Sequence, residues 1–118
     1  DNYLQRNHLI SMVEFFHKDM ALIVGEDDRV YDPVTAAQAC DSLLTMSGVD
    51  ASFIITKRAD GQIGVSARST GSINVQIIME RMGGGGHLSS GATQLKDKSI
   101  AEVKQLLLET IDYIDDNE

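Results

Sequence analysis

The sequence has few features that would cross-link the chain or span a membrane. Its 118 residues include one cysteine, one proline and no tryptophan. The single thiol, Cys40, excludes an internal disulfide, and we expect it to be buried in a protein from a reducing, cytoplasmic setting. No apolar run approaches the roughly 20 residues of a membrane span. No signal peptide is recognisable at the start of the chain.

Positive charge is also scarce. Lysine and arginine total 10 residues against 18 of aspartate and glutamate, which gives a net charge of −8. A protein that binds duplex nucleic acid needs a basic surface, so we expect no duplex nucleic acid among the partners. A small anionic ligand held by a few local donors remains compatible with this charge. The apolar share of 42 % and charged share of 24 % indicate a globular domain.

The hydrophobic pattern predicts a mixed α/β (α+β) fold with a central mixed sheet of about four strands covered by helices. Helical periodicity is expected over residues 3–17, 33–47, 75–82 and 100–114. Strand patterns occupy residues 20–24, 51–58, 62–68 and 92–95. We interpret residues 1–18 as a connector helix from a missing upstream domain and residues 19–118 as the domain itself.

Two helix starts carry specific capping signals. Asp32 suits an N-cap, and Pro33 suits the first helical position, where its missing N–H costs nothing. Ser99 and Glu102 have the spacing of a capping box, in which each side chain accepts from the other residue's backbone N–H. Both signals predict where a helix begins.

The segment before residue 69 has the pattern of a β-hairpin. Asp60-Gly61 is a turn signal, and Lys57 and Arg58 beside it are interpreted as a solvated hairpin end. The return strand alternates, with Ile63, Val65 and Ala67 on one face and Gly64, Ser66 and Arg68 on the other. The second face has little bulk, so a helix or a ligand can approach it closely.

The most informative feature is a run of four glycines, Gly83–Gly86, followed by His87. Each glycine loses more backbone freedom on folding than another residue would, and a helix cap needs only one. Successive N–H groups without a Cβ can form an anion-holding concavity, and His87 can donate to a phosphate or stack on a base. The run is neither a Walker loop nor a dinucleotide-binding fingerprint. A flexible loop is the alternative.

Other polar residues nearby could complete an anion site. Arg68 and Ser69 end the alternating strand, and a guanidinium matches a phosphate or a base edge. Ser89 and Ser90 follow the histidine and could add hydroxyl donors. Each of these has an ordinary surface or turn role as its alternative. No nucleophile motif and no Asp/His cluster for a catalytic metal pair is recognisable.

Two motifs in combination resemble a known family. Residues 64–69 read Gly-Val-Ser-Ala-Arg-Ser, and residues 82–94 read Met-Gly-Gly-Gly-Gly-His-Leu-Ser-Ser-Gly-Ala-Thr-Gln. Over about residues 20–114 the chain resembles the DHH-associated C-terminal domain, subfamily one. The form of the glycine motif is most similar to the membrane-anchored cyclic-di-AMP phosphodiesterases of Gram-positive bacteria, the GdpP/YybT type.

That resemblance implies a division of labour. An upstream DHH domain, absent from this sequence, would bind two manganese ions and hydrolyse cyclic di-AMP or a linear dinucleotide, and this domain would close over it and grip the substrate. No metal or other cofactor is expected in this chain, which should be inactive alone. The resemblance assigns substrate contacts to six residues: Arg68, Ser69, Gly84, Gly85, Gly86 and His87. Ser89 and Ser90, the possible hydroxyl donors, complete the predicted substrate site. The parent would be a signalling enzyme anchored in the cell membrane, with this domain on the cytoplasmic side.

Three alternatives stay open. The chain could be an RNA- or tRNA-binding module, although the charge of −8 argues against it. It could come from a RecJ-like small-oligonucleotide hydrolase, although those usually show Gly-Gly-Gly-His-Pro where Leu88 follows the histidine here. It could also be a dimerisation domain, and a homodimer is left open in any case.

Overall fold

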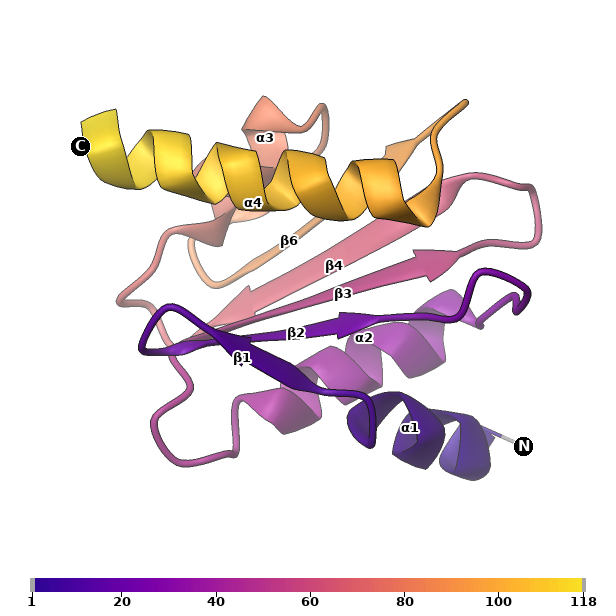
Figure 1. Cartoon of the computed structure of the whole chain (residues 1–118). Coiled ribbons are helices and arrows are strands. Elements are labelled where there is room, and N and C mark those ends of the chain that lie inside the picture. Colours follow the sequence, from indigo (N-terminus) through magenta and orange to yellow (C-terminus); the bar gives the residue numbers. More distant parts are fainter. Residues whose placement is uncertain (1, 118) are drawn as a thin grey trace.

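A single twisted sheet organises the molecule, with two helices on each face (Figure 1). The computed structural model describes residues 2–117. The helices are α1 (Asn2–Ile10), α2 (Pro33–Leu43), α3 (Val75–Arg81) and α4 (Ile100–Asn117). The strands are β1 (Glu14–Phe16), β2 (Met20–Val24), β3 (Ala51–Lys57), β4 (Ile63–Ser69), β5 (Gly85–His87) and β6 (Ser90–Leu95).

The six strands lie in the order β1-β2-β3-β4-β6-β5. Only β2 and β3 pair in parallel, with α2 as the crossover between them, and all other neighbours are antiparallel. The predicted turn at Asp60-Gly61 joins β3 to β4, and Gly61 has the positive φ of 85° that the turn requires. The fold class predicted from the sequence, a mixed sheet covered by helices, is therefore confirmed.

One face of the sheet is covered by α3 and α4. Phe53, Ile55 and Val65 are fully buried there against α3 and α4, whose core residues include Met79 and Leu107. The face is a continuous apolar layer, because β2, β3 and β4 contribute alternate apolar residues to it and β6 adds Leu95. This is the larger of two hydrophobic clusters.

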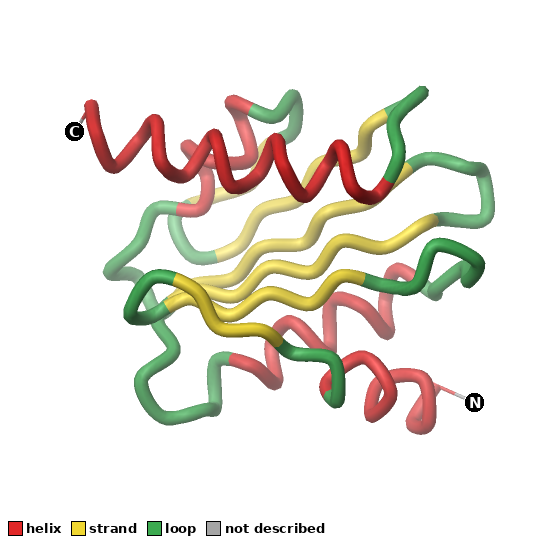
Figure 2. The backbone as a smooth tube through the Cα atoms, in the orientation of Figure 1, coloured by secondary structure: helices red, strands yellow, loops and turns green. Residues whose placement is uncertain are grey.

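The other face is covered over only part of its width. Ala21, Ile23 and Ile54 are buried there beneath α1 and α2. Beyond β4 the same face carries small and polar side chains, and Gln94 and Ala92 of β6 are exposed. Figure 2 shows the strands as a layer between the helix pairs. The part of this face formed by β6, β5 and the adjoining side of β4 is called the open face below.

Both predicted helix starts are confirmed. The Asp32 carboxylate accepts a hydrogen bond from the backbone N–H of Thr35 at 3.1 Å, and Pro33 opens α2. Ser99 and Glu102 form the reciprocal capping box, with N–H···O distances of 2.8 and 3.0 Å. These hydrogen bonds hold the pKa of the Glu102 carboxyl below its usual range.

Two predictions of extent were wrong. The sheet has six strands rather than about four, because β1 and β5, each three residues long, complete its edges. The helix expected over residues 3–17 ends at Ile10, and residues 14–16 turn back as β1 against β2. His17 allows this turn by adopting a φ of +51°. The interpretation of residues 1–18 as a connector stays a prediction.

None of the four helices within residues 2–117 combines the length and the apolar character that crossing a bilayer requires.

Candidate functional site

Three of the predicted site residues lie side by side across the open face. Arg68 of β4 is directly opposite Ser90 of β6, and Ser90 is directly opposite His87 of β5. Residues directly opposite in an antiparallel pair project to the same face. The sheet therefore brings Arg68 beside two residues that lie at least 19 positions later in the sequence. It places a cation, a hydroxyl and an imidazole in one row.

The glycine run begins by ending α3. Gly83 has a φ of +91°, its N–H donates to the Glu80 carbonyl at 3.1 Å, and the Gly84 N–H donates to the Met79 carbonyl at 2.8 Å. This pair of bonds is a Schellman cap. A Cβ on Gly84 would also collide with the Ala92 carbonyl oxygen of β6. The fold itself thus requires the first two glycines.

Gly86 is required as well, but Gly85 is not. Gly86 has a φ of +145°, and a Cβ there would collide with the Ser90 carbonyl oxygen. Gly85 has no positive φ, and a Cβ built on it meets nothing within 4 Å. A glycine in a strand is disfavoured by roughly 0.5–1 kcal/mol relative to alanine. Gly85, beside the Arg68–Ser90–His87 row, is therefore a glycine that neither its φ nor its neighbours require.

Arg68 is held in place by an acidic neighbour. Its Nε donates to the Asp41 carboxylate of α2 at 2.8 Å, and its Nη1 donates to the Ala67 carbonyl at 3.0 Å. The arginine side chain is 21 % exposed and the aspartate side chain 60 % exposed. No hydrogen bond within residues 2–117 uses Nη2, so this nitrogen is available to a ligand while Asp41 orients the guanidinium.

His87 is exposed at the end of the edge strand β5. The turn that follows is anchored by two backbone hydrogen bonds. The Val75 N–H donates to the Leu88 carbonyl at 3.1 Å, and the Ser69 N–H donates to the Ser89 carbonyl at 2.9 Å. The ring is thus carried on a fixed turn while its own surface stays accessible.

Ser69 and Ser89 do not join the row. Ser69 follows Arg68 in β4 and projects to the α3 face, where it is 5 % exposed. Its hydroxyl donates to the Ile73 carbonyl at 2.6 Å and accepts from the Gly71 N–H at 2.9 Å, so it closes the loop before α3. Ser89 is exposed in the β5–β6 turn, and its carbonyl holds Ser69.

Cys40 is a core thiol, as predicted. It is fully buried on α2, and its Sγ lies 3.3 Å from the Ser52 hydroxyl. Burial raises the pKa of the Cys40 thiol from 9.0 to about 12, against the smaller lowering effect of the Ser52 hydrogen bond. The thiol therefore stays protonated at neutral pH and offers no nucleophile.

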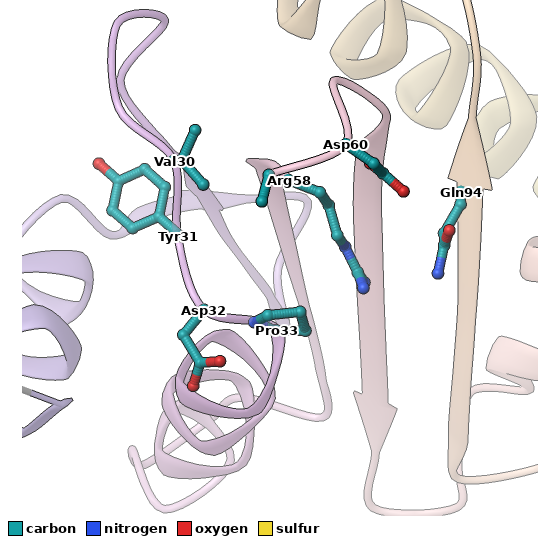
Figure 3. Close-up of a pocket in the computed structure, with 8 residues that line it drawn as sticks. Val30, Tyr31, Asp32, Pro33, Arg58, Asp60 and Gln94 are labelled. Carbon is teal, nitrogen blue, oxygen red and sulfur yellow. The ribbon is translucent and has the colours of Figure 1, made fainter.

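A second feature of the open face escaped the sequence reasoning. Arg58, interpreted above as part of a solvated hairpin end, instead lies across Gly64 of β4, where a Cβ would collide with its guanidinium. Figure 3 shows it reaching in front of β4 towards Gln94 of β6. It lines a cavity of about 380 Å³ with Tyr31, Pro33 and others. The absence of bulk at Gly64 was the available signal.

Metal-binding side chains gather at one place within residues 2–117, away from this face. His17, Asp112 and Asp115 offer ligand atoms within 4.8 Å of one another, and all three are exposed. His17 follows β1, at the opposite edge of the sheet from β5. His17 Nε2 lies 3.4 Å from an Asp112 oxygen. This group neither adjoins the row of predicted site residues nor provides ligands for two ions.

Comparison with known proteins identifies the family. Residues 14–114 match the DHHA1 domain family. The chain belongs to the DHHA1 domain family. The curated relatives of this DHHA1 domain include the "Cyclic-di-AMP phosphodiesterase PdeA" of Listeria monocytogenes, 54 % identical over 110 residues, or 93 % of this chain and 17 % of that protein. The "Cyclic-di-AMP phosphodiesterase GdpP" of Geobacillus thermodenitrificans is 50 % identical over 115 residues, 97 % of this chain and 18 % of that protein.

The fold recurs among solved structures. An exopolyphosphatase-related protein from Bacteroides fragilis superposes with a TM-score of 0.76 at 19 % identity, covering 92 % of this chain and 34 % of that one. At such identity the likeness shows the fold of the DHHA1 domain and no more. The chain spans less than a fifth of the length of the two phosphodiesterases named above.

Proposed function

We propose that this DHHA1 domain is the substrate-recognition part of a bacterial phosphodiesterase that hydrolyses cyclic di-AMP or a linear dinucleotide. The open face would receive a nucleotide phosphate between Arg68 and His87. Ser90 would donate a hydroxyl from the middle of the row. The observation that carries the proposal is Gly85, a glycine that the fold does not need, in the strand that carries His87.

Two further observations support a nucleotide ligand. The curated relatives that share half of this sequence are named as cyclic-di-AMP phosphodiesterases. The row itself combines a planar cation, a hydroxyl donor and an aromatic imidazole, which together suit a phosphate with an adjoining base. Ser69, assigned as a contact by the family resemblance, and Ser89, predicted as a hydroxyl donor, would act by fixing the turn rather than through free hydroxyls in the row.

Hydrolysis itself is assigned to another part of the protein. The exposed His17, Asp112 and Asp115 do not fit a two-manganese centre, because they supply too few ligands and lie at the far edge of the sheet. Manganese is therefore proposed for an upstream DHH domain. The contribution of the DHHA1 domain is orientation of the substrate, which accounts for a large share of many phosphoryl-transfer barriers.

The setting of the whole protein belongs to the same proposal. A membrane anchor, a cytoplasmic position for this domain and a role in signalling follow from the resemblance to the GdpP type. A homodimer and the exclusion of duplex nucleic acid also stay proposals, the latter supported by the net charge of −8.

Calorimetric titration tests the site. Cyclic di-AMP and the 5′-phosphorylated linear diadenylate (pApA) would be titrated into this chain and into a longer chain that includes the upstream segment. His87→Ala should weaken binding about tenfold, a loss of about 1.4 kcal/mol for one charge-assisted contact. His17→Ala is the matched control, since it removes an exposed histidine at the other edge of the sheet.

Two results would contradict the proposal. Equal affinities for wild type and His87→Ala would move the site off the row. Preference for long RNA, with a steep dependence on salt, would favour the RNA-binding alternative instead.

A further inference from the structure

Arg58 is a half-buried arginine whose side chain lacks its usual partners. Its Nε is the one buried side-chain nitrogen or oxygen in residues 2–117 that lacks a hydrogen-bond partner. None of the ion pairs within that range includes it. Leaving a buried donor unsatisfied is unfavourable, and more so when the group is charged. A guanidinium with a buried and unpaired Nε is a candidate for binding a ligand.

The cavity beside Arg58 has the chemistry of a nucleobase site. Its volume of about 380 Å³ lies within the range of small-molecule sites. Apolar edges come from Val30, Pro33 and Ala59, and polar groups from Arg58, Gln94, Asp32 and Asp60. Two carboxylates beside one cation disfavour a phosphate, whereas a purine presents both donors and acceptors and an apolar face.

This cavity and the Arg68 row lie on the same face of the sheet. Gly64, under the Arg58 guanidinium, is directly opposite Gln94, and Arg68 is directly opposite Ser90. The two positions are four residues apart on β4, which is about 13 Å along a strand. Only Ala92 of β6 lies between Gln94 and Ser90 on this face, so nothing bulky separates the two ends.

We propose that Arg58 and Gln94 form a subsite for a purine base of the bound dinucleotide, at the other end of the open face from Arg68 and His87. The planar guanidinium would stack on the base, and the Gln94 amide would hydrogen-bond its edge, the bidentate pairing that glutamine makes with adenine. This inference rests on the proposed function, because it takes the ligand to be a nucleotide whose phosphate is held at Arg68.

Nitrogen-15 NMR of this chain separates the two ends of the ligand. Adenosine carries a base without phosphate, and ribose 5-phosphate carries a phosphate without a base. Adenosine should shift the Arg58 Nε–H and the Gln94 side-chain amide signals. Ribose 5-phosphate should shift the His87 and Ser90 amide signals and leave Arg58 unchanged. This comparison uses the wild-type chain, so it does not depend on how a variant folds.

Variants then measure the contribution to dinucleotide binding. Arg58→Ala and Gln94→Ala should each weaken pApA binding about three- to tenfold and abolish the adenosine shifts at the altered subsite. Binding of ribose 5-phosphate should stay the same. Arg6→Ala is the matched control, because it removes an arginine from the outer helix α1.

The outcomes distinguish this inference from the function on which it rests. If pApA shifts the His87 signals and His87→Ala weakens binding, while Arg58→Ala and Gln94→Ala bind normally, the subsite is wrong and the proposed function stands. If pApA shifts no signal on the open face, both are wrong. Adenosine shifts confined to His87 would also overturn the subsite, since they would place the base at the other end.

Discussion

The two parts of the α1/α2 face of the sheet differ in one respect that explains both fold and site. Under α2, strands β2 and β3 present Ala21, Ile23 and Ile54, each no more than 1 % exposed. On the open face, β6 presents Ser90, Ala92 and Gln94 in the same alternation. Backbone geometry is continuous between them, so the difference lies in the side chains alone. Apolar bulk marks where a helix packs, and small or polar residues mark where none does.

The boundary between these parts is where charged groups concentrate. β4 separates the covered part from the open one. Arg68 lies near the end of β4, and Arg58, in the hairpin after β3, places its guanidinium over Gly64 near the start of β4. The residues of β4 that share this face with Arg68 are the small Gly64 and Ser66. A long cationic side chain at such a boundary can pack its stem on the covered side and present its head to a ligand on the other.

The largest effect should follow from truncating the covered part. Ile54→Ala removes a fully buried side chain beneath α2 and should lower the free energy of unfolding by about 2–5 kcal/mol, through lost burial and a residual cavity. Gln94→Ala, at an exposed position, should change it by less than about 0.5 kcal/mol. Urea unfolding followed by circular dichroism measures both. Similar losses for the two variants would mean that the open face is packed in solution.

A pH-dependent effect of intermediate size should come from Cys40. Because burial raises the pKa of this thiol from 9.0 to about 12, the folded state holds the proton after the unfolded state has lost it. Stability is therefore full below pH 9 and falls as the pH rises towards 12. At pH 10.5 the loss should be about 2 kcal/mol, at 1.36 kcal/mol for each unit of separation.

The matching control for that slope is Cys40→Ala. This variant should lack the extra loss between pH 9 and 10.5, while lysine and tyrosine titrations affect both proteins alike. Parallel curves of unfolding free energy against pH would contradict a strongly raised thiol pKa.

Strong local signals account for what the sequence predicted. The Asp32-Pro33 and Ser99/Glu102 caps and the Asp60-Gly61 turn depend on residues close in the chain, and all three form as expected. Part of the row of candidate site residues could be predicted too, because alternation in β4 placed Arg68 on the face of small residues.

The missed features depend on contacts between distant segments. Strand β5 consists of Gly85–His87, which has little β propensity, and it exists because β6 offers it a pairing edge. The apolar spacing over residues 3–17 fits a helix, so β1 can be recognised only from its pairing with β2. The path of Arg58 over Gly64 and the pairing of Arg68 with Asp41, 27 residues earlier, follow from tertiary geometry that no local pattern encodes.

Gly85 and Gly86 offer a comparison within one strand. Gly85→Ala should keep or slightly raise the unfolding free energy, because its Cβ meets open space and alanine is less flexible when unfolded. It should still weaken dinucleotide binding about tenfold by blocking close approach to the backbone. Gly86→Ala should destabilise the domain, since its φ is +145° and its Cβ would meet Ser90. Thermal melts and calorimetry report the two quantities, and unchanged affinity in Gly85→Ala would remove the main support for the site.

The smallest expected effect on stability concerns the boundary itself. Asp41→Asn removes the charge that pairs with Arg68 at 2.8 Å, and it should cost about 0.2–1 kcal/mol because the aspartate side chain is 60 % exposed. Its effect on binding should have the opposite sign. An anionic ligand competes with Asp41 for the guanidinium, so the variant should bind pApA several-fold more tightly, most clearly at low salt.

The competing role for Asp41 is orientation of the guanidinium. If orientation dominated over competition, Asp41→Asn would bind pApA more weakly at every salt concentration, and Asp41→Glu would restore affinity by restoring the charge. If competition dominates, Asp41→Glu should bind no better than wild type. The sign of the change in affinity of Asp41→Asn for pApA therefore decides whether α2 lowers ligand affinity at the open face or supports it. The salt dependence shows how much of that change in affinity is electrostatic.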